Sequence, residues 1–437
     1  MEKVLILGAG LVSKPMVDYL LSKGFFVRVA TRTVSKAEAL TKGHKNGESV
    51  QWTADDKEGL TKMVKDSSLV VSLLPYAHHP DVAEICIQEG KNMVTTSYVS
   101  EKMSEMDGRA GEANIIILNE IGLDPGIDHM SAMKIIDDVH SKKGVIESFR
   151  SVCGALPSPE ASNNPFRYKF SWSPRGVAFA GRNSARYLID GKEIKIPGKE
   201  LFKDYSTTEI PDIGRLEVYP NRNSIPYIEK YGIKDVNTMF RGTLRYSGWC
   251  DLWYNISRLG LLDTEEKEFN GMSYKEFMKS LAGAKADDIR GEAAKYLGIN
   301  KDSEILDKIE WLSLFSDDKI KIEKGGNIDV FVEKLLEKLQ YKDGERDMVI
   351  LKDEFIVRYI NKREKIISTL IDFGVIGEDT AIARTVSLPA AVAVKLIIEG
   401  EIKEKGVHIP TKPDIYEPVL RELETLGISF REDVLEI

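Results

Sequence analysis

The sequence predicts an α/β protein with a doubly wound parallel sheet, followed by an α+β domain that carries an inserted all-helical domain. Short apolar runs alternate with helical periodicity over about the first 120 residues, which is typical of parallel strands joined by crossover helices. After residue 124 the chain becomes rich in Arg, Tyr and Trp, and residues 259–340 are charged and helix-patterned. At roughly 150 residues per domain, the 437 residues predict two or three domains.

The first domain begins with a strand over residues 3–7, whose apolar run is expected of a strand buried on both faces of a sheet. Gly8-Ala9-Gly10 ends this strand, and apolar residues at helical spacing predict a helix from about residue 11 to 22. The same alternation predicts further strands over residues 26–30, 50–52, 69–73, 92–94 and 115–118. It predicts further helices over residues 35–40, 56–64, 80–88 and 104–111.

The second domain is predicted to open with a helix over residues 128–139. The strands and long loops that follow are expected to be antiparallel and to include residues 145–153, 166–173, 218–227 and 239–246. Two later β-rich segments, 347–359 and 365–373, predict a hairpin that rejoins this sheet. Helices predicted over residues 380–398 and 415–426 are expected to pack back onto the first domain.

Composition restricts the setting and the partners. The net charge of −8 disfavours nonspecific binding to nucleic acid, which needs a basic face. Cys86, Cys153 and Cys250 lie too far apart to predict a metal site or a disulfide framework, so we expect a reducing, cytoplasmic setting. The N-terminus lacks the pattern of a signal peptide. The apolar stretch 388–398 is short and contains Lys395, so no membrane span is expected.

A glycine loop follows the first strand. Gly8 and Gly10 lie between a strand and a helix, where backbone amides can receive a pyrophosphate; a merely tight structural turn is the alternative. Ser13 stands where the third glycine of the common pattern would be. The second strand ends in Thr31-Arg32-Thr33, and Arg32 can pair with a ribose 2′-phosphate, which favours NADP over NAD. A solvated basic loop would show the same residues.

Polar residues follow the later strands of the first domain. Thr96-Ser97-Tyr98 lies at the carboxyl end of a strand, where open α/β sheets bind ligands. Tyr98 is interpreted as a proton donor, a substrate contact or a packing residue. The loop 119–129 holds three carboxylates and an imidazole beside a Gly/Pro turn, which indicates a cleft. His129 in this loop could equally satisfy a helix end.

Basic side chains recur in the second domain among aromatic and glycine-rich segments: Arg167, Lys169, Arg175, Arg222, Arg241 and Arg245. Guanidinium groups in a partly dry cleft bind carboxylates in a bidentate manner. Taken singly, each is more often a solvated charge or an ion pair. Together they suggest a polycarboxylate substrate. Cys153 and Cys250 are by default small buried hydrophobic residues.

These segments together resemble the saccharopine reductase family, also called saccharopine dehydrogenase, L-glutamate-forming. The resemblance is carried in order by residues 4–10, 72–76, 119–129, 168–176, 241–246 and 345–349. It implies a discontinuous Rossmann domain (1–123 and about 388–437), an α+β domain for substrate binding and dimerisation (124–258 and about 341–387) and a helical insert (259–340). It further implies a homodimer.

The resemblance implies the reaction as well. Members of this family reduce, with NADPH, the imine formed from L-2-aminoadipate 6-semialdehyde and L-glutamate, and so form L-saccharopine in the aminoadipate route of lysine biosynthesis. The partners are then small molecules: saccharopine, glutamate and the semialdehyde. A lysine-breakdown enzyme that uses NAD, a carboxynorspermidine-forming relative and a scaffold protein without catalysis are the alternatives.

The resemblance also assigns residues. The implied NADP(H) contacts are Gly8, Gly10, Leu11, Val12, Ser13, Thr31, Arg32, Thr33, Leu74, Thr96, Ser97, Leu123, Asp124, Pro125 and Ser173. The implied saccharopine contacts are Ser97, Tyr98, Asp124, Arg222, Thr243, Leu244 and Arg245. Imine chemistry needs proton transfer, for which Asp124, Tyr98 and Cys153 are the candidate catalytic residues. The sequence does not rank them as acid and base.

Overall fold

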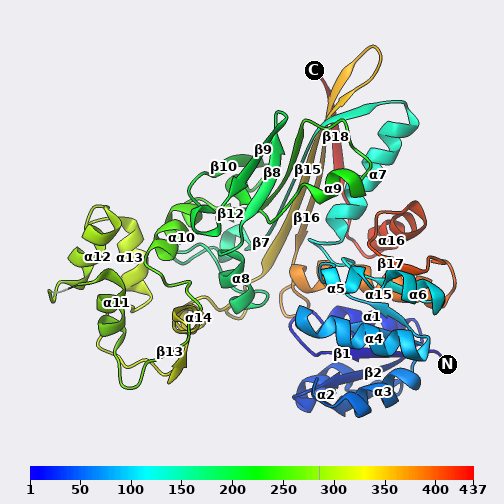
Figure 1. Ribbon diagram of the computed structural model, residues 1–437, viewed down its shortest axis with the longest axis horizontal. Coiled ribbons are helices and arrows are strands. Elements are labelled where there is room, and N and C mark those ends of the chain that lie inside the picture. Colours follow the sequence, from blue (N-terminus) through cyan, green and yellow to red (C-terminus); the bar gives the residue numbers. More distant parts are fainter. Residues whose placement is uncertain (285) are drawn as a thin grey trace. The chain divides into compact units, whose positions relative to one another are not determined.

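The computed structural model describes residues 1–284 and 286–437 and consists of two compact units (Figure 1). Unit 1 comprises Met1–Glu147, Lys230–Asp235 and Met348–Ile437. Unit 2 comprises Ser148–Glu229 and Val236–Asp347. The three-domain boundaries drawn from the sequence stay predictions.

Unit 1 contains a seven-stranded sheet in the order β17-β6-β5-β4-β1-β2-β3, in which every neighbouring pair is parallel. The strands are β1 (Lys3–Leu7), β2 (Phe26–Thr31), β3 (Gly47–Gln51), β4 (Leu69–Ser72), β5 (Asn92–Val94), β6 (Ile116–Leu118) and β17 (Gly406–His408). The predicted doubly wound sheet is confirmed. The order reverses between β1 and β4, and such a switch point is where open α/β sheets bind their ligands.

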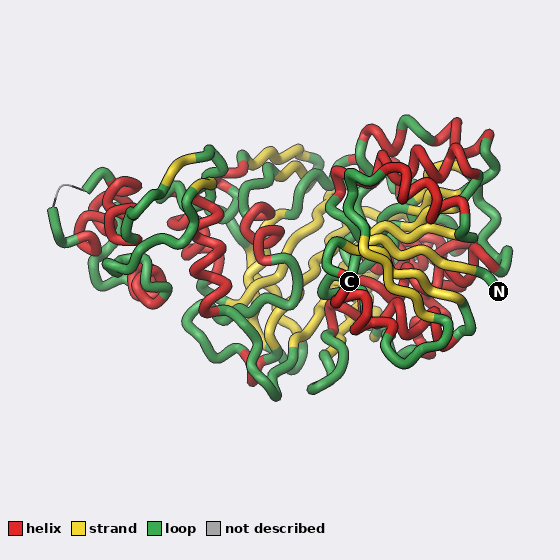
Figure 2. Tube along the Cα trace, turned by 90° about the horizontal axis from the view of Figure 1, so that it is seen from below, coloured by secondary structure: helices red, strands yellow, loops and turns green. Residues whose placement is uncertain are grey.

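Unit 1 also contains helices, several of which flank this sheet (Figure 2). They are α1 (Lys14–Ser22), α2 (Val34–Thr41), α3 (Lys57–Lys65), α4 (His79–Glu89), α5 (Glu101–Ser104), α6 (Asp107–Glu112), α7 (Ile127–Ser141), α15 (Ala381–Ile398) and α16 (Pro413–Thr425). The single helix expected over residues 104–111 is thus two shorter helices. The short 3-10 helix η1 (Tyr76–His78) leads into α4. On one face, Leu5 and Val70 of the sheet pack with Leu60 of α3 and Val82 of α4.

Helix α15 packs against α1, β4, β5 and α16, as expected from its apolar sequence. By length and composition alone it could cross a membrane, yet 78% of it is buried inside the protein, as in a core helix. Lys395 lies on α15 and is 2.8 Å from a carboxylate oxygen of Glu422 on α16. This ion pair therefore compensates for the charge of Lys395 in the second half of the apolar helix α15.

Unit 1 also contains the predicted hairpin. Strands β15 (Asp347–Arg358) and β16 (Arg363–Phe373) pair in antiparallel register, and β18 (Arg431–Glu436) adds to β16. At the hairpin's end, the Glu147 carboxylate accepts from both Arg358 and Arg363 at 2.7 Å. The hairpin prediction is confirmed, whereas β18 carries no signal that the sequence analysis recognised.

Unit 2 has a sheet with strands in the order β10-β11-β12-β7: β10 (Ser206–Ile210), β11 (Gly214–Pro220), β12 (Thr238–Tyr246) and β7 (Val145–Pro157). Strands β8 (Ala185–Ile189) and β9 (Lys192–Ile196) extend from β12. The expectation of antiparallel strands is wrong for β12 and β7, which are parallel because a long crossover returns the chain between them. Residues 166–173 form no strand, since Phe170 donates to Leu339 outside the sheet.

The helices of unit 2 are α8 (Pro174–Ala180), α9 (Pro226–Lys230), α10 (Trp249–Arg258), α11 (Tyr274–Ala282), α12 (Ile289–Leu297), α13 (Glu304–Trp311) and α14 (Asn327–Lys338), with short 3-10 turns η2 (Pro159–Ala161) and η3 (Gly198–Glu200). Helix α9 ends at Lys230, the first residue of the segment Lys230–Asp235 that is assigned to unit 1. The predicted helical block 259–340 contains α11 to α14. It also contains a two-residue ladder between β13 (Lys267–Glu268) and β14 (Lys324–Gly325).

Candidate active site

The glycine loop of unit 1 is closed by a serine. Gly8 has φ +112°, and a Cβ at this position would lie 3.1 Å from the Leu73 carbonyl oxygen, so glycine is needed. The buried Ser13 hydroxyl accepts from the Gly10 N–H at 2.9 Å and donates to the Gly8 carbonyl at 3.4 Å. Residues 11–13 are therefore a turn, and α1 begins at Lys14 rather than at residue 11. This arrangement suits a pyrophosphate, because the open loop meets a helix N-terminus.

The adenine side of the loop presents an available cation. Thr31 ends β2, and Arg32 and Thr33 are exposed beyond it. Arg32 forms no ion pair with any other residue that the structure describes. An exposed guanidinium without a carboxylate partner can receive a 2′-phosphate, and the residues present therefore fit NADP.

A histidine that the sequence analysis did not single out connects the ends of β4 and β5. His79 Nδ1 lies 2.9 Å from the Ser72 hydroxyl, and Nε2 lies 2.8 Å from the Ser97 hydroxyl. Burial, followed by the charge of His78, lowers the pKa of His79 to about 4. The neutral imidazole thus holds the Ser97 side chain in place. Leu74 and Thr96, half-buried at the same carboxyl ends, are placed where the cofactor was predicted to bind.

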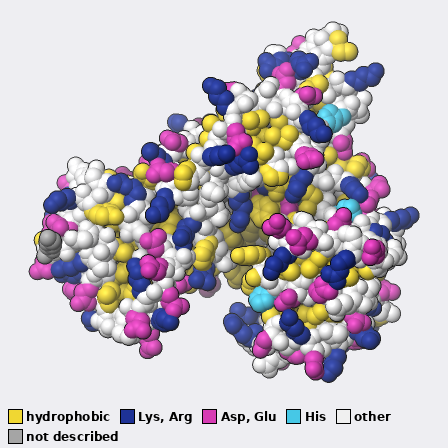
Figure 3. Space-filling view, viewed as in Figure 1, with side chains coloured by type: hydrophobic (Ala, Val, Ile, Leu, Met, Phe, Trp, Pro, Cys, Tyr) yellow, Lys and Arg dark blue, Asp and Glu magenta, His cyan; other side chains and the backbone are white. Residues whose placement is uncertain are grey.

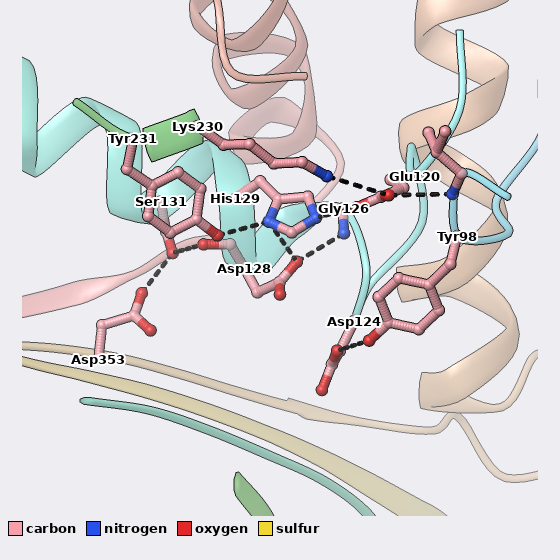
Figure 4. Close-up of polar contacts among 11 residues, drawn as sticks. Tyr98, Glu120, Asp124, Gly126, Asp128, His129, Ser131, Lys230, Tyr231 and Asp353 are labelled. Carbon is pink, nitrogen blue, oxygen red and sulfur yellow. Dashed lines mark hydrogen bonds and ion pairs between the residues drawn. The ribbon is translucent and has the colours of Figure 1, made fainter. Parts of the chain in front are cut away.

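Tyr98 and Asp124 meet at this edge of the sheet (Figure 4). The Tyr98 hydroxyl donates to Asp124 Oδ1 at 2.8 Å. The loop that carries Asp124 folds back on itself, since the Gly122 N–H donates to the Pro125 carbonyl at 2.9 Å. At Gly126, φ is +146° and a Cβ would lie 2.1 Å from the Gly122 carbonyl oxygen, so no other residue fits. The structure therefore brings two of the three candidate catalytic residues into direct contact.

Behind this pair lies a buried polar cluster. The Glu120 carboxylate contacts His129 Nε2 at 2.8 Å and the Lys230 ammonium at 3.9 Å. His129 Nδ1 lies 2.6 Å from the Tyr231 hydroxyl, and Asp128 accepts from the Gly126 N–H at 2.6 Å. His129 is fully buried in the first turn of α7, where it binds side chains. The density of carboxylates noted in the sequence thus corresponds to an ordered network.

Unit 2 brings together the other predicted residues. Cys153 on β7 is in register with Thr243 on β12, and Arg245 lies two residues further along β12. The Arg245 guanidinium is 3% exposed and lies over the rings of Tyr168 and Trp249, 5.2 Å from each centroid. One guanidinium N–H group donates to the Leu244 carbonyl, but Nε has no hydrogen-bond partner. A buried donor of this kind needs an acceptor.

The remaining basic residues of unit 2 are arranged differently. Arg222 is exposed at φ +53°, and its carbonyl accepts from the Arg186 N–H at 2.9 Å. Lys169 is buried against the Glu345 carboxylate, and this ion pair compensates for its charge inside the unit. Ser173 is exposed and caps α8 by accepting from the Gly176 N–H.

Metal ligands are not grouped in the described part of the chain, where no set of three or more His, Cys, Asp and Glu side chains could hold an ion. Two family models match the chain. A saccharopine dehydrogenase NADP binding domain matches residues 4–118, and a saccharopine dehydrogenase C-terminal domain matches residues 122–428.

The chain belongs to the saccharopine dehydrogenase family. It is 38% identical over 449 residues to saccharopine dehydrogenase (NADP(+), L-glutamate-forming) of Schizosaccharomyces pombe, with 100% of both chains covered. It is 37% identical to the alpha-aminoadipic semialdehyde synthase of Bos taurus, where the match covers 98% of this chain and 47% of that protein. The apo saccharopine dehydrogenase (L-Glu forming) from Saccharomyces cerevisiae superposes with a TM-score of 0.90 at 36% identity over 100% of both chains. These matches confirm the family that the sequence motifs predicted. The structural match confirms the predicted fold.

Proposed function

We propose that this chain is an NADP-dependent saccharopine dehydrogenase. It reduces the imine of L-2-aminoadipate 6-semialdehyde and L-glutamate to L-saccharopine, reversibly, in the aminoadipate route of lysine biosynthesis. The full-length match to enzymes of that name supports this function. The observation that carries it is the hydrogen bond between Tyr98 and Asp124 at the ligand-binding edge of a sheet whose glycine loop suits NADP.

NADPH supplies the hydride when bound. The chain's own residues hold the cofactor: the loop closed by Ser13 receives the pyrophosphate, and Arg32 pairs with the 2′-phosphate. The His79 imidazole holds the Ser97 hydroxyl in place, and Ser97 is proposed to contact the cofactor and the substrate. The other contacts implied by the family resemblance stay predictions at their numbered positions.

Asp124 and Tyr98 are proposed to handle protons and charge at the reacting nitrogen. A carboxylate that already accepts from the tyrosine hydroxyl can stabilise a cationic amine and orient it for proton transfer. In unit 2, Arg245 is proposed to receive a substrate carboxylate, because its buried Nε otherwise lacks an acceptor. Arg222, Thr243 and Cys153 are proposed as further substrate contacts.

The test uses the purified full chain with L-saccharopine and either NADP⁺ or NAD⁺. The proposed function predicts NADPH absorbance with saccharopine, release of glutamate, and a strong preference for NADP⁺. In the other direction, mass spectrometry should detect saccharopine only when the semialdehyde, glutamate and NADPH are all present. Turnover with NAD⁺ alone would favour the lysine-breakdown alternative, and absence of turnover with every pair would leave the scaffold alternative.

We also propose that the enzyme is a homodimer in the cytoplasm. Strand β18 leaves the apolar side chains of Val434 (57%) and Leu435 (52%) exposed, as does Ile437 (58%) directly after it, and a second copy could cover them. The cysteines are buried, and no disulfide joins them in the described chain, in keeping with a reducing compartment. Charged side chains of both signs are interspersed over the face seen in Figure 3. Light scattering of the purified chain tests the dimer, and fractionation of cells tests the compartment.

A further inference from the structure

Glu120 binds the chain on both sides of Tyr98. Its backbone N–H donates to the Ser97 carbonyl at 3.1 Å, and its carboxylate Oε1 accepts from the Val99 N–H at 3.0 Å. The two peptide groups that flank Tyr98 are therefore both attached to one residue of the neighbouring loop. Rotation of the backbone at Tyr98 would break at least one of these hydrogen bonds.

The second carboxylate oxygen ties Glu120 to α7. Oε2 lies 2.8 Å from His129 Nε2, and His129 is itself fixed by the Tyr231 hydroxyl at 2.6 Å. Glu120 is 1% exposed, and His129 is completely buried (Figure 4). Burial acts to raise the pKa of Glu120, but the hydrogen bond and charge of His129, the charge of Lys230 and the Val99 amide lower it to about 2. These contacts favour the ionised form of the Glu120 carboxyl group.

The backbone at Glu120 adopts an unusual conformation. Its φ of +56° lies in the left-handed region, which residues other than glycine rarely adopt. Asn119 on one side donates to the His408 carbonyl of β17, and Ile121 on the other donates to the Thr95 carbonyl. This conformation lets the Glu120 N–H reach Ser97 while the carboxylate of the same residue reaches Val99.

Asp124 is held by the same loop. Four residues after Glu120, its carboxylate accepts from the Tyr98 hydroxyl at 2.8 Å, and the loop then returns to α7, where His129 lies. Glu120 consequently connects the segment that carries Tyr98, the loop that carries Asp124 and the helix behind both.

We propose that Glu120 is a positioning residue that keeps the Tyr98 hydroxyl aligned with the Asp124 carboxylate for the reaction. The inference rests on the proposed function, because alignment of this pair matters only if the pair takes part in catalysis. Glu120 itself is separated from the reacting atoms by these two residues and acts through them.

A double-mutant cycle on the full chain tests the inference. Glu120→Ala removes the carboxylate bond to Val99, and we expect kcat/KM for saccharopine to fall about as far as in Tyr98→Phe, roughly 5-fold for one lost hydrogen bond, because Glu120 acts through the Tyr98 hydroxyl. In a Tyr98→Phe background the same replacement should cost less than about 2-fold, because the hydroxyl that Glu120 aligns is already gone. Glu120→Gln keeps an oxygen that can accept from Val99, so it should restore part of the lost activity.

Glu84→Gln is the matched control. Glu84 is a partly exposed carboxylate of unit 1 that pairs with Arg109 on the surface, and its replacement should leave kcat/KM unchanged. Thermal unfolding of each variant reports the effect on folding. If Glu120→Ala does not fold, the cycle is completed with Glu120→Gln, for which a smaller loss that disappears in Tyr98→Phe is still expected.

Two results distinguish the inference from the proposed function. If the unmodified chain and Glu84→Gln turn over saccharopine but the Glu120 and Tyr98 replacements have independent effects on kcat/KM, Glu120 only stabilises the fold and the inference is overturned. If the unmodified chain does not turn over saccharopine, the proposed function fails and the inference fails with it. Coupled losses in an active enzyme establish the positioning role.

Discussion

Acidification should destabilise the protein through His79. The imidazole is 2% exposed and lies between the hydroxyls of Ser72 and Ser97, at 2.9 and 2.8 Å. Burial and the charge of His78 lower its pKa from 6.5 to about 4. Because the folded-state pKa is below the unfolded one, the unfolded chain binds more protons between these two pH values. Stability is therefore fully present above pH about 6.5 and is lost as the pH falls toward 4.

The size of the effect follows from the same values. The pKa difference between 6.5 and about 4, at 1.36 kcal/mol per pKa unit, corresponds to about 3.4 kcal/mol. The free energy of unfolding should fall by this amount in total once the pH lies below both pKa values. Between pH 6.5 and 5, which is easier to measure, the loss should be about 2 kcal/mol. His79→Gln removes the titrating group but keeps a side chain that can hydrogen-bond to both hydroxyls. Its stability should therefore depend less on pH than that of the unmodified chain.

Two measurements check this prediction. Denaturant unfolding at a series of pH values gives the difference in free energy between the unmodified chain and His79→Gln, and that difference should change by up to about 1.4 kcal/mol per pH unit. NMR of ¹³C-labelled histidine gives the titration of the imidazole directly, with His79→Gln identifying its signal. The exposed His44 offers a matched control, since His44→Gln should follow the unmodified chain. A difference that stays constant between pH 7 and 5, or a His79 midpoint at or above 6.5, would refute the reasoning.

Three further predictions concern ligands and protons. Arg32→Asp should weaken NADPH far more than NADH, by roughly 1–3 kcal/mol in binding titrations, because a charge-assisted hydrogen bond to the 2′-phosphate is lost; equal losses for both cofactors would remove Arg32 from the site. Arg222→Ala and Arg245→Ala should each raise the apparent KM for saccharopine with little change in NADPH affinity, and unchanged substrate kinetics would contradict the assignment of that arginine. Asp124→Asn should lower kcat/KM substantially and alter its pH profile, whereas Tyr98→Phe and Cys153→Ser should cost about one hydrogen bond each, roughly 1 kcal/mol. A pH profile of Asp124→Asn that overlays that of the unmodified enzyme would eliminate Asp124, and a far larger loss in Cys153→Ser would move the central role to the thiol.

Local patterns predicted much of the architecture. The apolar run of β1, the glycine break and the helical spacing of α1 are properties of consecutive residues, so they could be read directly from the chain. The β15–β16 hairpin was likewise predictable, because its two strands are neighbours in sequence. Strand β17 was missed, since its three residues have no pattern of their own and pair with β6 from nearly 300 residues away. The parallel pairing of β7 and β12 was missed because residue type does not encode strand direction.

The sequence by itself determined the fold class, the family and the kinds of side chain available for chemistry: a glycine loop, an arginine after β2, and the loop with Asp124. Only the tertiary structure decided how these groups are used. It showed that Ser13 closes the glycine loop, that Lys169 is neutralised by Glu345, and that His79 and Glu120 hold Ser97 and Tyr98 in place. The physical reason is that hydrogen bonds and ion pairs act over a few ångströms in space, whereas their partners here come from separate strands and loops. Periodicity and motif spacing carry no information about which polar atoms meet when those segments pack.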